Sequence, residues 1–415
     1  MAATETRQKR PLKREEKRVL ALLGLPTLTL ALAITVITTY VPKLASAFTG
    51  STTIIGLIVG AEGFLALWVP LVAGAWSDRI ETPLGRRMPF LLAATPPLVA
   101  ALVAVGYMGS LGGIAIAVFV FFLAYFVAYE PYRALYPDLV DDEIAGRAQS
   151  TQAVWRGAGT GLALVCGGLL FGASKSAPFT VSGALVAIGM GLFTYVSIKR
   201  RPKSRRDGKP DPVRQQVRNL WELIRDDGRL RAYLVANALW ELSLGALKTF
   251  VILYITDGLG YSVFAAAAIV GAVALVVLIA APVSGRMSDR LGSTTVMRIS
   301  LPLYGAGLIV PLFVRTPWVL GPILPLIAFG GGVIMTLPYA MLMPLMPKGE
   351  HGALTGFYSL SRGIGVMLGP LLAGVAVSVL KAPLSSTHGF AAMWLVCSVS
   401  VLASIPLVGR VGDED

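Results

Sequence analysis

The sequence predicts an all-α membrane protein whose twelve transmembrane helices form two six-helix bundles related by pseudo-two-fold symmetry. Three observations predict this fold: the composition, a series of long apolar runs and a repeat between the two halves. Of its 415 residues, 55% are hydrophobic and 14% are charged, whereas soluble domains average about 45–50% apolar and about 25% charged residues. This composition excludes an ordinary soluble domain.

Twelve apolar runs are each long enough to cross a bilayer core as a helix, which takes roughly 20 residues. The predicted spans are 19–42, 53–75, 90–108, 113–137, 150–171, 178–198, 232–256, 263–284, 298–315, 318–345, 353–378 and 388–408. The chain also has 45 glycines and 26 prolines, which spanning helices tolerate because neighbouring helices satisfy the freed backbone groups. We therefore expect bent, closely packed helices.

One long polar stretch, 199–231, divides the chain into an N-terminal bundle, 1–198, and a C-terminal bundle, 232–415. We interpret it as a basic linker between the halves. Its segment "PVRQQVRNLWELIRDD" could form an amphipathic helix on the membrane surface. Such a helix would serve either lipid binding or simple tethering of the halves.

The distribution of Lys and Arg predicts the orientation of the helices. Of the 36 Lys and Arg residues, 28 fall in the termini and loops of one side and four on the other. The positive-inside rule therefore predicts a multi-pass protein of the cell (inner) membrane with both termini in the cytoplasm. The net charge of +13 then faces anionic lipids of the bilayer. We expect no nucleic-acid partner, and we expect a monomer.

A charged island between two apolar runs occurs twice. "GAWSDRIETPLGRR" at 74–87 resembles "GRMSDRLGSTTVMR" at 285–298, and each follows the second span of its half. The match superposes Asp78 on Asp289. Repeats of six spans in the same order predict two similar bundles related by an axis along the membrane normal.

The repeated island is a candidate gate. A carboxylate at a helix end can accept hydrogen bonds from helix N-termini or pair with arginines in one conformation and release them in another. The candidate gating residues are Asp78, Arg79, Arg86, Arg87, Asp289 and Arg290. The alternative is that the islands are merely solvated loops.

Two motifs resemble a known family. "SDRIETPLGRRMPF" is similar to the helix 2–3 signature of the cation-coupled glycoside, pentoside and hexuronide symporters and of the related sucrose transporters, within the major facilitator superfamily. "PYRALYPDLVDDEIAGR" resembles the end of helix 4 in the same families. The resemblance covers nearly the whole chain and implies the major facilitator fold.

Seven charged residues lie well inside the predicted spans, away from their ends. They are Glu62, Glu130, Arg133, Arg156, Glu241, Lys248 and Arg362. A charge near the bilayer centre needs a partner or a water-filled cavity, so these residues indicate the functional site. The alternatives are that the Glu130/Arg133 and Glu241/Lys248 pairs only orient helices, and that Arg156 and Arg362 extend to water at the membrane surface.

The candidate proton-coupling residues are Glu130, Glu62 and Glu241. The resemblance implies an acidic cation-site residue near Glu130. Sodium-using members carry aspartates on helix 2, where this chain has the apolar "LALWVPLVAG". We therefore expect a proton rather than sodium as the coupling ion, and we expect no metal and no cofactor.

Basic and aromatic residues beside these acids are the candidate substrate-binding residues. They are Arg133, Arg156, Arg362, Lys248, Trp155, Tyr132 and Tyr358. The resemblance implies basic, substrate-facing positions on helices 5 and 11 at Arg156 and Arg362. Aromatic faces suit sugar rings, although aromatic residues in membrane helices also serve as packing residues.

The sequence therefore predicts a secondary transporter that works by alternating access, with proton-coupled symport of a sugar or glycoside as its function. The alternative is a proton-driven exporter of a drug-like or amphipathic compound, for which methionines clustered near Met341 would suit an adaptable cavity. No P-loop, no G-x-S-x-G element and no metal-spaced His or Cys occurs, so we expect no enzyme.

Overall fold

The computed structural model describes residues 13–80, 82–140, 145–200, 218, 222, 224–345 and 351–411. Across these ranges the chain is helical and contains no β-strand. Twelve helices within them are long and apolar enough to cross a membrane, which confirms the predicted all-α fold. The predicted surface helix of the linker falls mostly outside the described residues.

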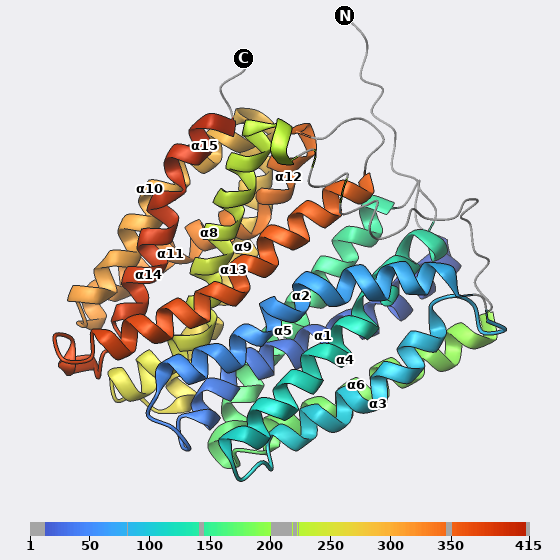
Figure 1. The fold of residues 1–415 in the computed structure, drawn as a ribbon, viewed down its shortest axis with the longest axis horizontal. Helices are drawn as coiled ribbons and strands as arrows, with labels where there is room; N and C mark the ends of the chain where they lie inside the picture. The colour runs from blue at the N-terminus through green and yellow to red at the C-terminus, as the bar shows by residue number, and fades with distance from the viewer. Residues whose placement is uncertain are drawn as a thin grey trace, which may run out of the picture.

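The first six helices form the N-terminal bundle (Figure 1). They are α1 (Arg14–Ala45), α2 (Thr52–Arg79), α3 (Met88–Val105), α4 (Leu111–Leu139), α5 (Ala145–Ala173) and α6 (Ala177–Arg200). All six contribute to one buried apolar cluster, in which the rings of Phe121, Phe122 and Phe179 have no exposed surface. Burial of these side chains holds the bundle together.

The second half of the chain forms the C-terminal bundle. Its helices are α8 (Gly228–Leu253) with the π-helical turn η2 (Tyr254–Gly258), α9 (Val263–Leu291), α10 (Ser293–Phe313), α11 (Pro317–Thr336), α12 (Pro338–Leu342) with the 3₁₀ turn η3 (Met343–Leu345), α13 (His351–Val379), the 3₁₀ turn η4 (Ser385–Thr387), α14 (Ala392–Ala403) and α15 (Ile405–Val411). A second apolar cluster joins these helices, and Ala45 and Ile55 of the N-terminal bundle reach into it.

Polar residues cap several of the helices. The side chains of Ser51, Asp227 and Ser262 accept hydrogen bonds from backbone N–H groups two or three residues later, at 3.4, 2.8 and 3.2 Å. These contacts satisfy donors that have no partner within the helix. They fix where α2, α8 and α9 begin.

Two predicted spans are interrupted. The predicted span 318–345 ends as an α-helix at Thr336, and the chain bends at Leu337 before α12. The predicted span 388–408 breaks at Ser404, between α14 and α15. A proline follows each break closely, at Pro338 and Pro406, and proline removes a helical hydrogen bond and clashes with the preceding turn.

The bundles meet mainly along two helix pairs, α2 with α13 and α5 with α9, and α1 also contacts α8. Figure 1 shows α2 and α13 side by side at the junction. A Cβ added at Gly56 of α2 would overlap the carbonyl oxygen of Pro370, and one at Gly168 of α5 would overlap the Cβ of Ala267. Small residues therefore allow the two bundles to approach closely, as is typical of helix packing in membranes.

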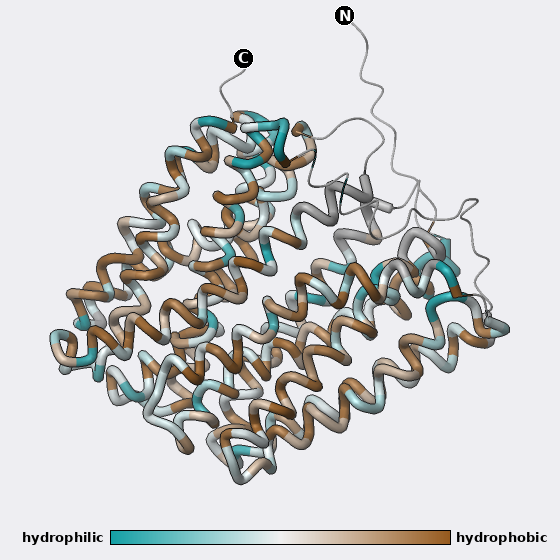
Figure 2. The backbone as a smooth tube through the Cα atoms, viewed as in Figure 1, coloured by the Kyte–Doolittle hydropathy of each residue, from teal (hydrophilic) through white to brown (hydrophobic). Residues whose placement is uncertain are grey.

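Apolar residues run along the helices, and hydrophilic residues gather near many helix ends (Figure 2). Large apolar side chains such as Phe313, Trp318 and Leu326 stand exposed on α10 and α11. An apolar outer surface of this kind faces lipid in a membrane protein. The structure is therefore that of a multi-pass membrane protein.

Candidate functional site

The seven intramembrane charges of the sequence lie together between the two bundles. We call this group the central cluster; it comprises Glu62, Glu130, Arg133 and Arg156 of the N-terminal bundle and Glu241, Lys248 and Arg362 of the C-terminal bundle. Ion pairs connect members within each bundle, and electrostatic interactions connect members across the junction of the bundles. A charged group at this depth is typical of a substrate or ion pathway.

Glu241 of α8 pairs with Arg362 of α13, and the nearest guanidinium and carboxylate atoms are 3.6 Å apart. The side chains are 12% and 38% exposed, respectively. Next to them, Asn237 donates a hydrogen bond of 2.7 Å to Ser361. The close contact of α8 with α13 thus positions this ion pair, which joins two helices rather than neighbouring turns of α8.

Glu62 lies one helix away, on α2, and only 8% of its surface is exposed. It takes part in no hydrogen bond or ion pair with the residues that the structure describes. It interacts electrostatically with Arg362 of α13 and with Lys248 and Glu241 of α8. Glu62 is therefore a buried carboxylate of one bundle that faces charges of the other.

A row of aromatic and charged residues follows one face of α4. The rings of Tyr125 and Tyr129 stack with centroids 5.2 Å apart, and the guanidinium of Arg133 lies 5.6 Å from the centroid of Tyr129. Arg133 also pairs with Glu130 at 3.6 Å. Their i, i+4 spacing places Tyr125, Tyr129 and Arg133 on one face, a signal that could have identified Tyr125 from the sequence.

Arg156 and Lys248 are exposed cations of the central cluster, as is Arg133. Arg156 of α5 interacts electrostatically with Tyr125 and with Tyr358 of α13, and Lys248 of α8 interacts with Glu62. Neither cation forms an ion pair with a carboxylate of the described residues. Each therefore faces groups of the opposite bundle without a direct counter-ion.

Two of the aromatic candidates lie against α1 rather than in the central cluster. Tyr132 has no exposed surface; its hydroxyl donates to the carbonyl of Leu23 and hydrogen bonds with Thr27. The ring of Trp155 lies so close to Gly24 that a Cβ there would overlap it. Both side chains pack α1 against its neighbours.

Polar contacts join the bundles on the side where α1 ends and α2 begins, which we call the far side. Lys43 of α1 forms an ion pair with Asp257 of η2. Thr52 donates to the carbonyl of Gly374 at 2.8 Å, and the hydroxyls of Thr53 and Ser378 are 3.2 Å apart. The bundles are thus in contact on the far side.

The two charged islands lie on the opposite side, where α1 begins and α15 ends; we call it the termini side. Asp78 belongs to the last turn of α2, but its side chain lies outside the described residues. Arg79 is exposed, Arg86 half-buried and Arg87 buried at the start of α3. The first island leaves residues 80–87 between its helices.

The second island is shorter. A single residue, Gly292, separates α9 from α10, and its φ of 80° is a value that favours glycine. Asp289 and Arg290 are exposed, and neither pairs with another described residue. The superposed islands therefore differ in the turn that follows their Ser-Asp-Arg triplets.

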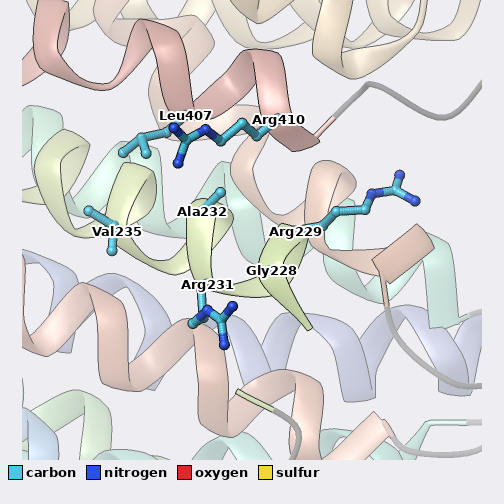
Figure 3. Close-up of a pocket in the computed structure, with 7 residues that line it drawn as sticks. All are labelled: Gly228, Arg229, Arg231, Ala232, Val235, Leu407 and Arg410. Atoms are coloured by element: carbon cyan, nitrogen blue, oxygen red, sulfur yellow. The ribbon is translucent and has the colours of Figure 1, made fainter. Parts of the chain in front are cut away.

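A pocket of about 470 Å³ lies at the first two turns of α8, against α15 (Figure 3). Two of its three arginines already bind backbone carbonyls: Arg229 donates to Val411 at 3.0 Å, and Arg231 donates to Ile224 at 3.4 Å. In Figure 3 the labelled arginines point away from one another. The pocket is separate from the central cluster.

The chain belongs to the Major Facilitator Superfamily, whose sequence pattern matches residues 23–370 and 242–412. The protein is thus a membrane transporter of that superfamily, which is not a family of enzymes. A crystal structure of a bacterial homologue of the human lysosomal transporter Spinster, inward-facing and unoccupied, shares the fold with a TM-score of 0.78 at 15% identity over 97% of each chain. A crystal structure of a D-xylose–proton symporter also shares the fold, with a TM-score of 0.72 at 13% identity over 95% of this chain and 98% of its own.

A curated relative is the multidrug resistance protein MdtG of Escherichia fergusonii, which is 26% identical over 175 residues. That match covers 41% of this chain and 41% of the relative. The chain therefore spans about two fifths of the length of this relative. This similarity does not identify the solute that the chain transports.

Proposed function

We propose that the protein is a proton-coupled symporter of a sugar-like solute that works by alternating access around the central cluster. The observation that carries this proposal is the gathering of seven intramembrane charges, with stacked tyrosines, at the junction of the two bundles. In transporters built from two repeated halves, solute and ion sites lie at such a junction. The D-xylose–proton symporter shares the fold, which makes a sugar the first solute class to test.

Glu62 is our first candidate for the proton carrier, with Glu130 and Glu241 as further candidates. Glu62 lacks a direct partner but faces Arg362 and Lys248, so its protonation changes the balance of charge around both cations. When Glu62 is ionised it attracts them, and when it is neutral they are available to a solute. Binding of proton and solute is coupled in this way.

The islands form the gate of the termini side, and the contacts of the far side form the opposite gate. In this structure the two bundles are in contact on the far side. On the termini side, Asp289 and Arg290 are exposed. The positive-inside rule orients the termini side toward the cytoplasm of the cell membrane and the basic linker toward anionic lipids. The conformation would then be open to the cytoplasm.

The test is acidification inside dye-loaded proteoliposomes after addition of monosaccharides, disaccharides, glucosides and sugar acids. We expect saccharide-dependent acidification that Glu62→Gln reduces at least about tenfold, because a general proton carrier cannot be replaced by an amide. Glu222→Gln is the matched control, since Glu222 is an exposed carboxylate outside the spans. Undiminished acidification in Glu62→Gln would refute Glu62 as the proton carrier. The same test would then be applied to Glu130→Gln and Glu241→Gln.

A second candidate function is proton-driven export of an amphipathic compound, because the MdtG relative is named a multidrug resistance protein. Met335 is exposed near the end of α11 and Met343 at the start of η3, and flexible methionines suit varied apolar ligands. Increased drug sensitivity on deletion, together with silence toward saccharides, would favour this function.

A further inference from the structure

The charge inventory of the central cluster indicates the charge of the solute. The cluster holds four cations and three carboxylates. Two carboxylates are taken up by ion pairs, Glu130 with Arg133 and Glu241 with Arg362, each at 3.6 Å. Of the remaining charged residues, Glu62 is the one carboxylate, and Arg156 and Lys248 are two cations that form no ion pair with the described residues.

We propose that the solute is a small organic monoanion, held between Arg156 of one bundle and Lys248 of the other. This inference rests on the proposed proton-coupled transport and adds the charge of the solute. An uncompensated cation at membrane depth is costly unless an anion or water faces it. Glu62 is the one remaining carboxylate for these two cations, and it offers no negative charge once it is protonated. An anionic group of the solute then takes its place.

The surroundings of the two cations suit an anion that bridges the bundles. Arg156 lies on α5 but interacts with Tyr358 of α13, and Lys248 lies on α8 but interacts with Glu62 of α2. Tyr125 and Tyr358 beside Arg156 offer hydroxyl donors to a carboxylate. A solute that binds both cations therefore draws the two bundles together, as alternating access requires.

The balance of charge also defines the stoichiometry. With Glu62 ionised and no solute, the cluster carries one net positive charge. Protonation of Glu62 adds one positive charge, and a bound monoanion removes one. The groups that face Glu62 are Arg362, Lys248, Glu241 and Tyr125, so proton uptake there acts directly on Lys248, one of the two cations proposed to bind the solute. The loaded and empty clusters have equal charge, and one proton moves with one anion electroneutrally.

The experiment compares matched acids and neutral analogues on the full chain in liposomes loaded with a pH-sensitive dye. The pairs are L-lactate and lactamide, gluconate and glucitol, and benzoate and benzamide. We expect acidification faster than in protein-free liposomes with the acid but not with its neutral partner, at a rate that an inside-negative potential set by valinomycin leaves unchanged. Two outcomes would overturn the inference while sparing the proposed function. In the first, the neutral partners drive proton uptake as fast as the acids do. In the second, the rate of acidification rises with the inside-negative potential.

Variants separate binding by the two cations from a general charge effect. Arg156→Gln and Lys248→Gln should each reduce acid-driven proton flux at least about tenfold, the effect of one lost charge-assisted hydrogen bond. Lys248→Arg should restore most of it. Lys381→Gln removes an exposed charge outside the spans and should change nothing. If both Gln variants keep the wild-type preference for acids, the inference fails. If every acid and neutral analogue of this panel and every saccharide of the earlier panel are silent, the proposed function fails with it.

Discussion

At the scale of single residues, the Glu241–Arg362 pair combines a structural role with a proposed functional one. Glu241 is the less exposed partner, at 12% against 38% of the side chain. Removal of the arginine therefore leaves a nearly buried carboxylate without its counter-ion. Breaking a buried pair costs more than replacing both partners, because an uncompensated charge is the expensive state.

We expect Arg362→Gln to lower the free energy of unfolding by about 2 kcal/mol, below the usual cost for fully buried pairs because Arg362 keeps accessible surface. The double variant Glu241→Gln/Arg362→Gln should recover most of that stability without recovering transport. Thermal denaturation of the purified protein in detergent measures the first effect, and proteoliposome flux the second. Equal loss of stability in the single and double variants would contradict a stabilising pair.

At the scale of helices, the junction of the bundles depends on glycine. Gly168 of α5 meets Ala267 of α9 so closely that a Cβ would overlap. Gly172, one turn later on the same helix, has open space around it. We expect Gly168→Ala to destabilise this packed arrangement by about 1–3 kcal/mol through overpacking and to slow transport. Gly172→Ala should behave as the wild type, and normal flux in Gly168→Ala would show that α5 and α9 move apart without cost.

The helices show what the sequence can predict and what it cannot. Apolar run length predicted all twelve spans because each run must satisfy its own backbone in lipid. It missed the interruptions at Leu337 and Ser404, since prolines in membrane helices produce either a bend or a break depending on their neighbours. The intramembrane charges were found because their burial is costly. The Glu241–Arg362 partnership was not, because pairing between helices depends on packing that no local pattern encodes.

At the scale of the whole molecule, the far side acts as a unit. The Lys43–Asp257 ion pair links α1 to η2, while Thr52 and Thr53 of α2 hydrogen bond with the end of α13. These residues come from helices far apart in sequence, and they meet only because the two bundles are in contact on the far side. Alternating access requires all of these contacts to break together when the far side opens.

A reversible cross-link tests this requirement. The hydroxyls of Thr53 and Ser378 are 3.2 Å apart, so cysteines at these positions lie within reach of a disulfide. We would introduce Thr53→Cys and Ser378→Cys in a Cys166→Ser background, because Cys166 is exposed whereas Cys397 is buried. Oxidation should stop transport almost completely, reduction should restore it, and Thr53→Cys alone should be insensitive to both treatments.

The same cross-link distinguishes opening of the far side from motion elsewhere. Since the disulfide would hold the bundles as they lie in this structure, the oxidised protein should still bind solute from the termini side while failing to release it across the membrane. Thermal stabilisation by solute in the oxidised protein measures that binding. Continued transport after complete oxidation would mean that the solute crosses without separation of α2 from α13, and the rocking of the two bundles would have to be abandoned.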